Sequence, residues 1–500
     1  MSESRLAVID CGSNSFRLVV FTYTDDWWKR TDEIHENVRV GEGLEATGAL
    51  QPAPMERALE TLDLYAHFCA ATHIEHVRPV ATSAIRDATN QAEFLALAEE
   101  RTGLTVEVLS GKEEARYGYL AAVNSTTLAQ GVVLDLGGGS MQLTRVEDRE
   151  AADARSWPLG AVRMTERFLP DPERAKRKQI KALREHVAAE IEAAAWVGDG
   201  GRLTGIGGTV RNLAAAAQLA AGLPSYGIQG FRLTRAALGE LIERMADLPA
   251  SKRGDIPGIK VGRGDLILAG AIVVDTVMEV GGFSVLEATD AGLREGVFFE
   301  ELLGDPPLVP DVRKATVLNL AAEYGTDFAH AEHVARLALE LWDGLAAAGV
   351  HDGDPDEREL LWATAMLHDI GMAVDYDDHH KHSRYLILSA GMPGYTPREV
   401  GLIGQAARYH RKGNPGLGEF SALARDGDEE LLARITAAVR IAEQLERSRD
   451  QSVHATDLDV SDGRVELRLH AAEDVKVARW ATQRQGDVFK RAFGCELSVI

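Results

Sequence analysis

Two segments of the chain carry the same short pattern, and this internal repeat constrains the fold more than any other feature. Residues 9–21 read I-D-C-G-S-N-S-F-R-L-V-V-F, and residues 134–146 read L-D-L-G-G-G-S-M-Q-L-T-R-V, an offset of 125 residues. Each copy is an apolar strand ending in an aspartate, then a turn of small residues and a second strand, which is typical of a tight β-hairpin. The repeat predicts a duplicated α/β architecture with a cleft between its halves.

The segments around the hairpins alternate between helix and strand, as an α/β fold requires. Periodicity predicts helices over residues 55–72, 91–101 and 173–195, and strands over 76–81 and 202–206. Proline and glycine at 304–307 interrupt the pattern and mark a boundary. We therefore predict two halves, residues 1–124 and 125–304.

Beyond residue 310 the sequence changes to long helical patterns and holds ten of the 15 histidines. Helices are predicted over 317–324, 330–348, 357–368, 397–409 and 429–447. Two strands around Ser461-Asp462-Gly463 and a helix over 475–493 follow. This organisation predicts an all-α domain over 310–447 and a small α+β segment over 448–500.

The charge balance and the cysteines limit the class of protein. Lys plus Arg number 54 and Asp plus Glu number 77, so the net charge of −23 argues against a general basic surface for DNA or membranes. Three cysteines without a C-x-x-C pair indicate no disulfide framework and favour a cytoplasmic location. The longest apolar run, residues 266–274, is too short to span a bilayer, and no signal-peptide pattern precedes the first strand.

The two hairpin turns are candidate phosphate sites, because small residues let backbone N–H groups converge on an anion. Asp10 and Asp135 precede the turns, where a carboxylate can hold Mg²⁺ or orient a water. A single D-x-G would equally be a plain tight turn, but two matching copies favour phosphate binding. The predicted phosphate-binding residues of the turns are Ser13, Asn14, Ser15, Gly137, Gly138, Gly139 and Ser140.

An ordered set of motifs extends this interpretation. They are I-D-C-G-S-N-S-F-R-L (9–18), A-T-S-A-I-R-D-A (81–88), L-S-G-K-E-E-A-R-Y (109–117), L-D-L-G-G-G-S (134–140), G-I-G-G-T (205–209) and G-L-R-E-G-V (292–297). With them the chain resembles the exopolyphosphatase and guanosine pentaphosphate phosphohydrolase family, within the sugar kinase, Hsp70 and actin superfamily. The resemblance implies two ribonuclease-H-like (actin-like ATPase) halves hinged around a phosphate-binding cleft, Mg²⁺ with a monovalent cation as a further candidate, and a homodimer.

The resemblance also assigns roles within the E-E-A-R motif. The family's catalytic carboxylate maps onto Glu114. Ser110 and Glu113 form an S-x-x-E capping box, which independently leaves Glu114 free to address the cleft. Arg86, after a strand, is suited to stabilise charge on the transferred phosphoryl group, although pairing with Asp87 or a surface carboxylate is an alternative.

Two further positions leave alternatives open. The family commonly has a glutamate where this chain has Gln142, so Mg²⁺ either relies more on Asp10, Asp135 and water or binds more weakly. Gly207, Gly208 and Thr209 lie where superfamily kinases bind adenosine; they either hold the end of a phosphate chain or form a plain tight crossover.

The histidine-rich region resembles the HD domain of metal-dependent phosphohydrolases. His330, His368 and Asp369 match its pattern, whereas Glu443 replaces the final aspartate. We favour a scaffold role over a second active site, because the resemblance implies a helical domain that shapes a polyphosphate path. The candidate path residues, whose alternative is a solvated charged face, are His379, His380, Lys381, His382, Arg384, Arg408, His410, Arg411 and Lys412.

Together these features predict an exopolyphosphatase that releases terminal orthophosphate from inorganic polyphosphate with Mg²⁺ and Glu114. The nearest alternative is a 5′-phosphatase of guanosine pentaphosphate (pppGpp), which yields ppGpp in the same cleft. A protein that senses polyphosphate or alarmone without turnover is a third hypothesis, and an active HD-like domain is a fourth.

Overall fold

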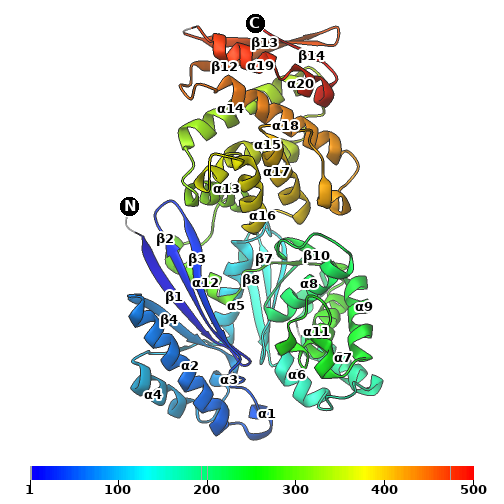
Figure 1. Ribbon diagram of the computed structural model, residues 1–500. Helices are drawn as coiled ribbons and strands as arrows, with labels where there is room; N and C mark the ends of the chain where they lie inside the picture. Colours follow the sequence, from blue (N-terminus) through cyan, green and yellow to red (C-terminus); the bar gives the residue numbers. More distant parts are fainter. Residues whose placement is uncertain (1–2, 193, 200, 473) are drawn as a thin grey trace. The chain divides into compact units, whose positions relative to one another are not determined.

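The chain divides into two compact units, Met1–Val312 and Arg313–Ile500, and the first unit contains two β-sheets of matching topology (Figure 1). The computed structural model describes residues 3–192, 194–199, 201–472 and 474–500. The first sheet has the order β3-β2-β1-β4-β5 and the second the order β10-β11-β9-β6-β7-β8. Their strands are β1 (Ser4–Cys11), β2 (Phe16–Tyr23), β3 (Trp28–Glu36), β4 (His76–Ala81), β5 (Glu107–Val108), β6 (Gly131–Leu136), β7 (Met141–Glu147), β8 (Glu150–Trp157), β9 (Arg202–Ile206), β10 (Phe231–Thr234) and β11 (Val285–Ala288).

The repeat seen in the sequence is a repeat of structure. In each sheet three antiparallel strands form a meander, and its first strand pairs in parallel with a later strand. Asp10 pairs with Arg17 across the first hairpin, and Asp135 pairs with Gln142 across the second. Each residue of the second pair therefore lies 125 positions after its counterpart in the first pair, and the predicted pair of α/β halves is confirmed.

The sequence predicted two-stranded hairpins, whereas each sheet extends to a third strand. β3 and β8 lie mostly exposed at the sheet edges, and their residues are largely polar or small. Edge strands of this kind lack the alternation of apolar residues that marks a half-buried strand. The pairing of β3 and β8 therefore depends on the neighbouring strand and cannot be predicted from their own sequence pattern.

Helices cover the sheets and also link the two halves. Gly296 of α12 faces α5 so closely that a Cβ there would lie 2.0 Å from the Tyr117 carbonyl oxygen, so these two helices pack backbone to backbone. α12 also packs on β1, while α5 packs on the second sheet. The helices of this unit are α1 (Leu44–Thr47), α2 (Pro52–Ala71), α3 (Ser83–Arg86), α4 (Gln91–Thr102), α5 (Gly111–Val123), α6 (Ala161–Phe168), α7 (Arg177–Ile191), α8 (Gly208–Ala220), α9 (Arg235–Ala246), α10 (Ala250–Arg253), α11 (Ile267–Val280) and α12 (Leu293–Leu303).

The longest apolar run of the sequence belongs to α11, which is buried along most of its length in the core of the second half. Asp275 interrupts the apolar surface and pairs with Arg184 and Arg235, which compensates its buried charge. Among the described residues, no helix combines the length and hydrophobicity needed to cross a membrane.

The second unit, Arg313–Ile500, is helical with a small sheet of order β12-β13-β14. Val465 and Phe489 of the last segment share one core with the preceding helices. The predicted helix over 475–493 is wrong in one respect: the structure has two helices, separated at Arg484 and Gln485. The elements are α13 (Val312–Glu323), α14 (Phe328–Ala347), α15 (Pro355–Leu367), α16 (His379–Ser389), α17 (Pro397–Tyr409), α18 (Asp428–Leu445), β12 (Val453–Ser461), β13 (Arg464–Ala471), α19 (Lys476–Gln483), α20 (Gly486–Phe493) and β14 (Glu496–Val499).

Candidate functional site

A cleft in the N-terminal unit is lined by residues of both halves. The two hairpin turns pack against each other in its lining, since a Cβ at Gly138 would lie 3.1 Å from Cβ of Ser13. Most of the site residues predicted in this unit line the cleft, namely Asp10, Ser13, Asn14, Ser15, Glu114, Asp135, Gly137, Gly138, Ser140, Gly207 and Gly208.

The turns present their peptide N–H groups because their carbonyl groups are held elsewhere. The N–H of Gly41 donates to the Ser13 carbonyl at 3.0 Å, and the N–H of Ala161 donates to the Gly137 carbonyl at 3.0 Å. In a trans peptide the N–H points opposite to the carbonyl, so the N–H groups of Asn14 and Gly138 point away from these partners. Both turns thus offer backbone donors of the kind that bind phosphate.

Three carboxyl groups meet in the cleft. Burial and the neighbouring Glu114 and Asp10 raise the pKa of Asp135 to about 7. Burial also raises the pKa of Asp10, although Arg294, 3.9 Å away, opposes the shift. Carboxylates that repel each other in a buried place are stabilised by a divalent cation, so Asp10 and Asp135 suit the predicted Mg²⁺.

Glu114 lies near the start of α5, where the predicted capping box is present. The Ser110 hydroxyl accepts from the Glu113 N–H at 3.2 Å, and Glu113 accepts from the Ser110 N–H at 2.7 Å. Glu113 is thereby turned toward the helix start, while Glu114 is 5% exposed and lines the cleft. Burial raises the pKa of Glu114, and the Arg86 guanidinium counteracts that effect.

Side chains around Glu114 hold its carboxylate in place. The Ser140 hydroxyl donates to it at 3.3 Å, and Arg86 forms an ion pair with it. The Gln142 amide nitrogen lies 3.4 Å from Glu114, 2.9 Å from the Ser140 hydroxyl and 3.0 Å from the Ser156 hydroxyl. Gln142 therefore donates to the Glu114 carboxylate. The glutamate that the resembled family commonly has at this position would instead bring a second negative charge.

Three predicted residues lie beside the cleft lining rather than in it. Arg86 contacts Glu114, donates to the Leu109 carbonyl at 2.9 Å, and donates to Asp87 at 3.3 Å, the pairing named as its alternative. A Cβ at Gly139 would meet the Ser83 hydroxyl at 2.4 Å, so this glycine permits tight packing. Thr209 is buried against Gly270 of α11.

Four arginines in the cleft lining were not predicted as site residues: Arg17, Arg211, Arg263 and Arg294. Burial and the neighbouring guanidinium groups lower the pKa of Arg17 and of Arg263 to about 10, and lower that of Arg211. Arg294 is 4% exposed, and its Nε has no hydrogen-bond partner. Arg17 and Arg294 lie within the sequence motifs 9–18 and 292–297, and this was the one sequence signal that could have identified them as site residues. This crowding of positive charge favours a polyanionic ligand.

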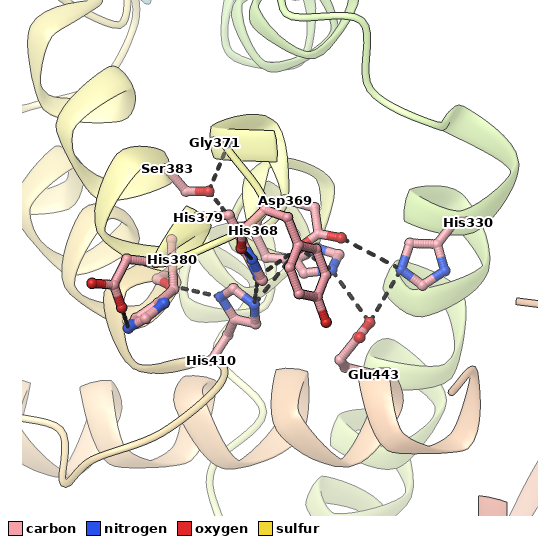
Figure 2. Close-up of polar contacts among 12 residues, drawn as sticks. His330, His368, Asp369, Gly371, His379, His380, Ser383, His410 and Glu443 are labelled. Carbon is pink, nitrogen blue, oxygen red and sulfur yellow. Dashed lines mark hydrogen bonds and ion pairs between the residues drawn. The ribbon is translucent and has the colours of Figure 1, made fainter. Parts of the chain in front are cut away.

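In the second unit, the predicted HD-like residues converge from three regions of the sequence (Figure 2). His330 Nε2 lies 3.1 Å from Glu443 Oε2 and 3.9 Å from Asp369 Oδ2, and His368 Nε2 lies 3.4 Å from Glu443 Oε2. Glu443 therefore reaches the other residues despite replacing an aspartate.

The predicted path residues divide between buried and exposed positions on α16, in the last turn of α17 and just after it. His379 and His410 are buried beside Asp369, at 3.3 and 3.6 Å. His380 is buried and His382 half-buried. Among the charged members, Lys381 and Lys412 pair with Asp378, Arg384 pairs with Glu419, Arg408 lies over Tyr409, and Arg411 lies over Tyr376.

Known proteins resemble both units. The model of the Ppx/GppA phosphatase family matches residues 20–304, and the model of Ppx/GppA phosphatase domain III matches residues 312–483. A Vibrio vulnificus protein named guanosine-5′-triphosphate,3′-diphosphate pyrophosphatase is 29% identical over 454 residues, which cover 89% of this chain and 88% of that protein.

Solved structures agree with the fold of the first unit. The Aquifex aeolicus member of the Ppx/GppA protein family is 29% identical with a TM-score of 0.53, over 61% of this chain and 99% of that chain. A structure described as an exopolyphosphatase-like protein is 29% identical with a TM-score of 0.55, over 59% and 97% of the respective chains.

Proposed function

The chain belongs to the Ppx/GppA phosphatase family, and from this membership we propose that it hydrolyses the terminal phosphoanhydride bond of pppGpp. The relative from Vibrio vulnificus, which aligns over most of both chains, is named a pyrophosphatase of this nucleotide, guanosine-5′-triphosphate,3′-diphosphate. This substrate was the alternative in the sequence analysis, and the named relatives favour it over the polyphosphate that we expected first.

The observation that carries the proposal is the pairing of a buried carboxylate with a cluster of arginines in one cleft. Glu114 lines the same cleft as the two hairpin turns, and Arg17, Arg211, Arg263 and Arg294 line it as well. Phosphoanhydride hydrolysis requires positioning and charge neutralisation above all. Several guanidinium groups suit a substrate with several phosphates, since each group can donate hydrogen bonds to two phosphate oxygens at once.

In this mechanism Glu114 orients a water and accepts its proton. The water oxygen forms a bond to the terminal phosphorus while the bond from that phosphorus to the bridging oxygen breaks, which yields orthophosphate and ppGpp. Arg86 and Gln142 position the Glu114 carboxylate through the contacts described above. Mg²⁺, when held by Asp10 and Asp135, would supply charge neutralisation on the phosphate oxygens.

Inorganic polyphosphate is the second candidate substrate. It needs the same anhydride chemistry and the same cluster of arginines, and a structural relative of the first unit is described as exopolyphosphatase-like. No guanosine pocket is required for it.

Phosphate release from pppGpp and from long polyphosphate, measured at equal concentrations, tests the choice. We expect a higher kcat/KM for pppGpp, and a clear preference for polyphosphate would overturn it. Glu114→Gln should lower kcat by about 10²- to 10⁴-fold while binding persists. Glu113→Gln is the matched control because glutamine preserves a capping box. Equal turnover in both variants would contradict the role of Glu114.

A further inference from the structure

Arg163 of α6 joins the two halves of the first unit beside the cleft. Its Nη2 donates to Asp87 Oδ2 at 2.8 Å, and its Nε lies 3.6 Å from Glu45 Oε2. Asp87 and Glu45 belong to the first half, whereas α6 belongs to the second. Figure 1 shows α1, α3 and α6 at the same end of the unit. Arg163 lies outside the set of described residues that line the cleft, so its role is separate from that of the cleft arginines.

The first residues of α6 are hydrogen-bonded to the second hairpin turn. The Ala161 N–H donates to the Gly137 carbonyl at 3.0 Å. The Val162 N–H donates to the Gly138 carbonyl at 2.8 Å. A Cβ at Gly160 would lie 2.3 Å from the Gly138 carbonyl oxygen, so the absence of a side chain lets the helix start approach the turn this closely. A movement of this turn therefore carries α6 and its arginine with it.

In the first half, Asp87 connects Arg163 to the proposed base. Oδ2 of Asp87 accepts from Arg163, while its Oδ1 accepts from Nε of Arg86 at 3.3 Å. Nη1 of Arg86 donates to the Leu109 carbonyl at 2.9 Å and forms the ion pair with Glu114. The Arg86 guanidinium is thus held at two of its nitrogen atoms, and its direction toward Glu114 depends on the position of Asp87.

The Asp87 carboxylate lies near the surface, where its orientation depends on its partners. Its side chain is 37% exposed, and the residue caps the C-terminus of α3, a helix of only four residues. Arg163 is better placed to keep one orientation, because its side chain is 20% exposed and its helix is bonded to the second turn. Holding a side chain in place before the reaction removes an entropic cost from the transition state.

A second contact between the halves lies beside the first. Glu166 of α6 is half-buried and accepts from the Gly43 N–H at 3.4 Å. Gly41 and Leu44 of the first half line one small cavity together with Val162 of α6. These contacts cross from one half to the other, so they exist only while the second turn and its helix lie against the first half.

We propose that Arg163 is a positioning residue for the hydrolysis proposed above, on which this inference rests. Arg163 fixes Asp87, and Asp87 fixes the guanidinium that pairs with Glu114. Because α6 moves with the second hairpin turn, this connection is complete only when both halves enclose the substrate. The phosphate-binding turn and the water-orienting carboxylate are thereby aligned in the same step.

The separation of kcat from KM tests this role. Arg163→Ala should lower kcat by about 10-fold and leave KM within about twofold, because the arginine positions the base without binding substrate. Arg163→Lys should keep kcat within about threefold of the wild type, since an ammonium group can still donate to Asp87. Thermal melts should place both variants close to the wild type, because a partly exposed ion pair contributes little to stability.

Arg167→Ala is the matched control on the same helix. Arg167 is exposed and contacts Phe168 and His186 within the second half, so its removal should change kcat by less than about twofold. Equal kcat values for Arg163→Ala and Arg167→Ala would overturn the positioning role. A rise of KM in Arg163→Ala that exceeds the loss of kcat would overturn it as well, because it would indicate a direct contact to substrate.

A double-mutant cycle tests the connection through Asp87. Asp87→Ala should lower kcat by about 10-fold or more, and the double variant with Arg163→Ala should have about the kcat of Asp87→Ala alone, because both changes remove the same contact. Losses that multiply would show that the two residues act independently, and would contradict the proposal.

Glu114→Gln separates a failure of this inference from a failure of the proposed function. Phosphate release is measured with pppGpp and, in parallel, with long polyphosphate, so the role of Arg163 is assessed on whichever substrate is hydrolysed. A wild type inactive on both, or activity that persists in Glu114→Gln, would contradict the proposed function and the inference together. Activity that requires Glu114 but is equal in Arg163→Ala and Arg167→Ala would contradict the inference alone.

Discussion

The amide nitrogen of Gln142 lies 3.4 Å from Oε2 of Glu114, with both side chains buried in the cleft wall. An amide donor next to a carboxylate stabilises the ionised form, whereas a second carboxylate there would repel it. Gln142 also contacts Ser140 and Ser156, so its orientation is held from two sides. The replacement of the usual glutamate therefore affects the proposed base directly.

Gln142→Glu should raise the pKa of Glu114 and shift the acidic limb of the pH–rate profile upward by about one unit. The limb moves to higher pH because a neighbouring negative charge disfavours ionisation of Glu114, and Glu114 must be ionised to accept a proton. The measurement is kcat/KM for phosphate release across the acidic range. Gln142→Met is the control, since it removes the donor without adding charge. A lower Mg²⁺ requirement with an unshifted limb would show instead that the introduced carboxylate acts as a metal ligand.

Arg86→Lys should lower kcat by about 10- to 100-fold with little change in KM. Arg86 contacts both Glu114 and the Leu109 carbonyl, and a lysine keeps the charge but cannot span both partners. Arg86→Ala, which also removes the charge, should in addition raise the pKa of Glu114 and move the acidic limb upward. A large rise of KM in Arg86→Lys would favour the direct phosphate contact that the sequence suggested.

Local features of the sequence predicted much of the cleft. The repeated hairpin placed Asp10 and Asp135 before two turns, and the S-x-x-E capping box correctly separated Glu113 from Glu114. These predictions succeed because a hairpin and a helix start depend on residues within a few positions of one another.

The arginine cluster and the full histidine group depend on contacts over long sequence distances. Arg211 and Arg263 lie on separate elements, and both reach the cleft because α8 and the segment before α11 meet there. His379 and His410 join His330 because α14, α16 and α17 pack around Asp369. An arginine or histidine alone in a helix has the same local pattern whether it faces solvent or a shared site.

Asp428→Asn should destabilise the second unit by about 3 kcal/mol, because it removes one partner of a buried ion pair. Asp428 is 2% exposed; it pairs with Arg398 of α17 and accepts from the Arg425 N–H at 2.7 Å. Burial opposes ionisation, but these partners outweigh it and lower the pKa of Asp428 below its usual value.

The ion pair also predicts a pH dependence of unfolding. Because the folded-state pKa is lowered, the stabilisation is present above about pH 4 and is lost as the pH falls through the folded-state value. Denaturant titrations of wild type and Asp428→Asn should therefore converge in acid. The exposed neighbour Asp426→Asn is the control, and a gap between wild type and Asp428→Asn that stays constant with pH would contradict this account.

Arg263→Ala should raise KM for pppGpp by about 10- to 100-fold with a smaller effect on kcat, because it removes a charge-assisted contact to phosphate. The same change should leave the unliganded protein as stable as the wild type or slightly more stable, since burial and the neighbouring Arg211 and Arg17 lower the pKa of Arg263 to about 10. Arg177→Ala on α7 removes an equal charge from an exposed position, and screening should keep its KM within about twofold of the wild type. Steady-state kinetics and thermal melts of the three proteins check both parts. Equal KM values for Arg263→Ala and Arg177→Ala would show that net charge, and not the cleft arginine, determines binding.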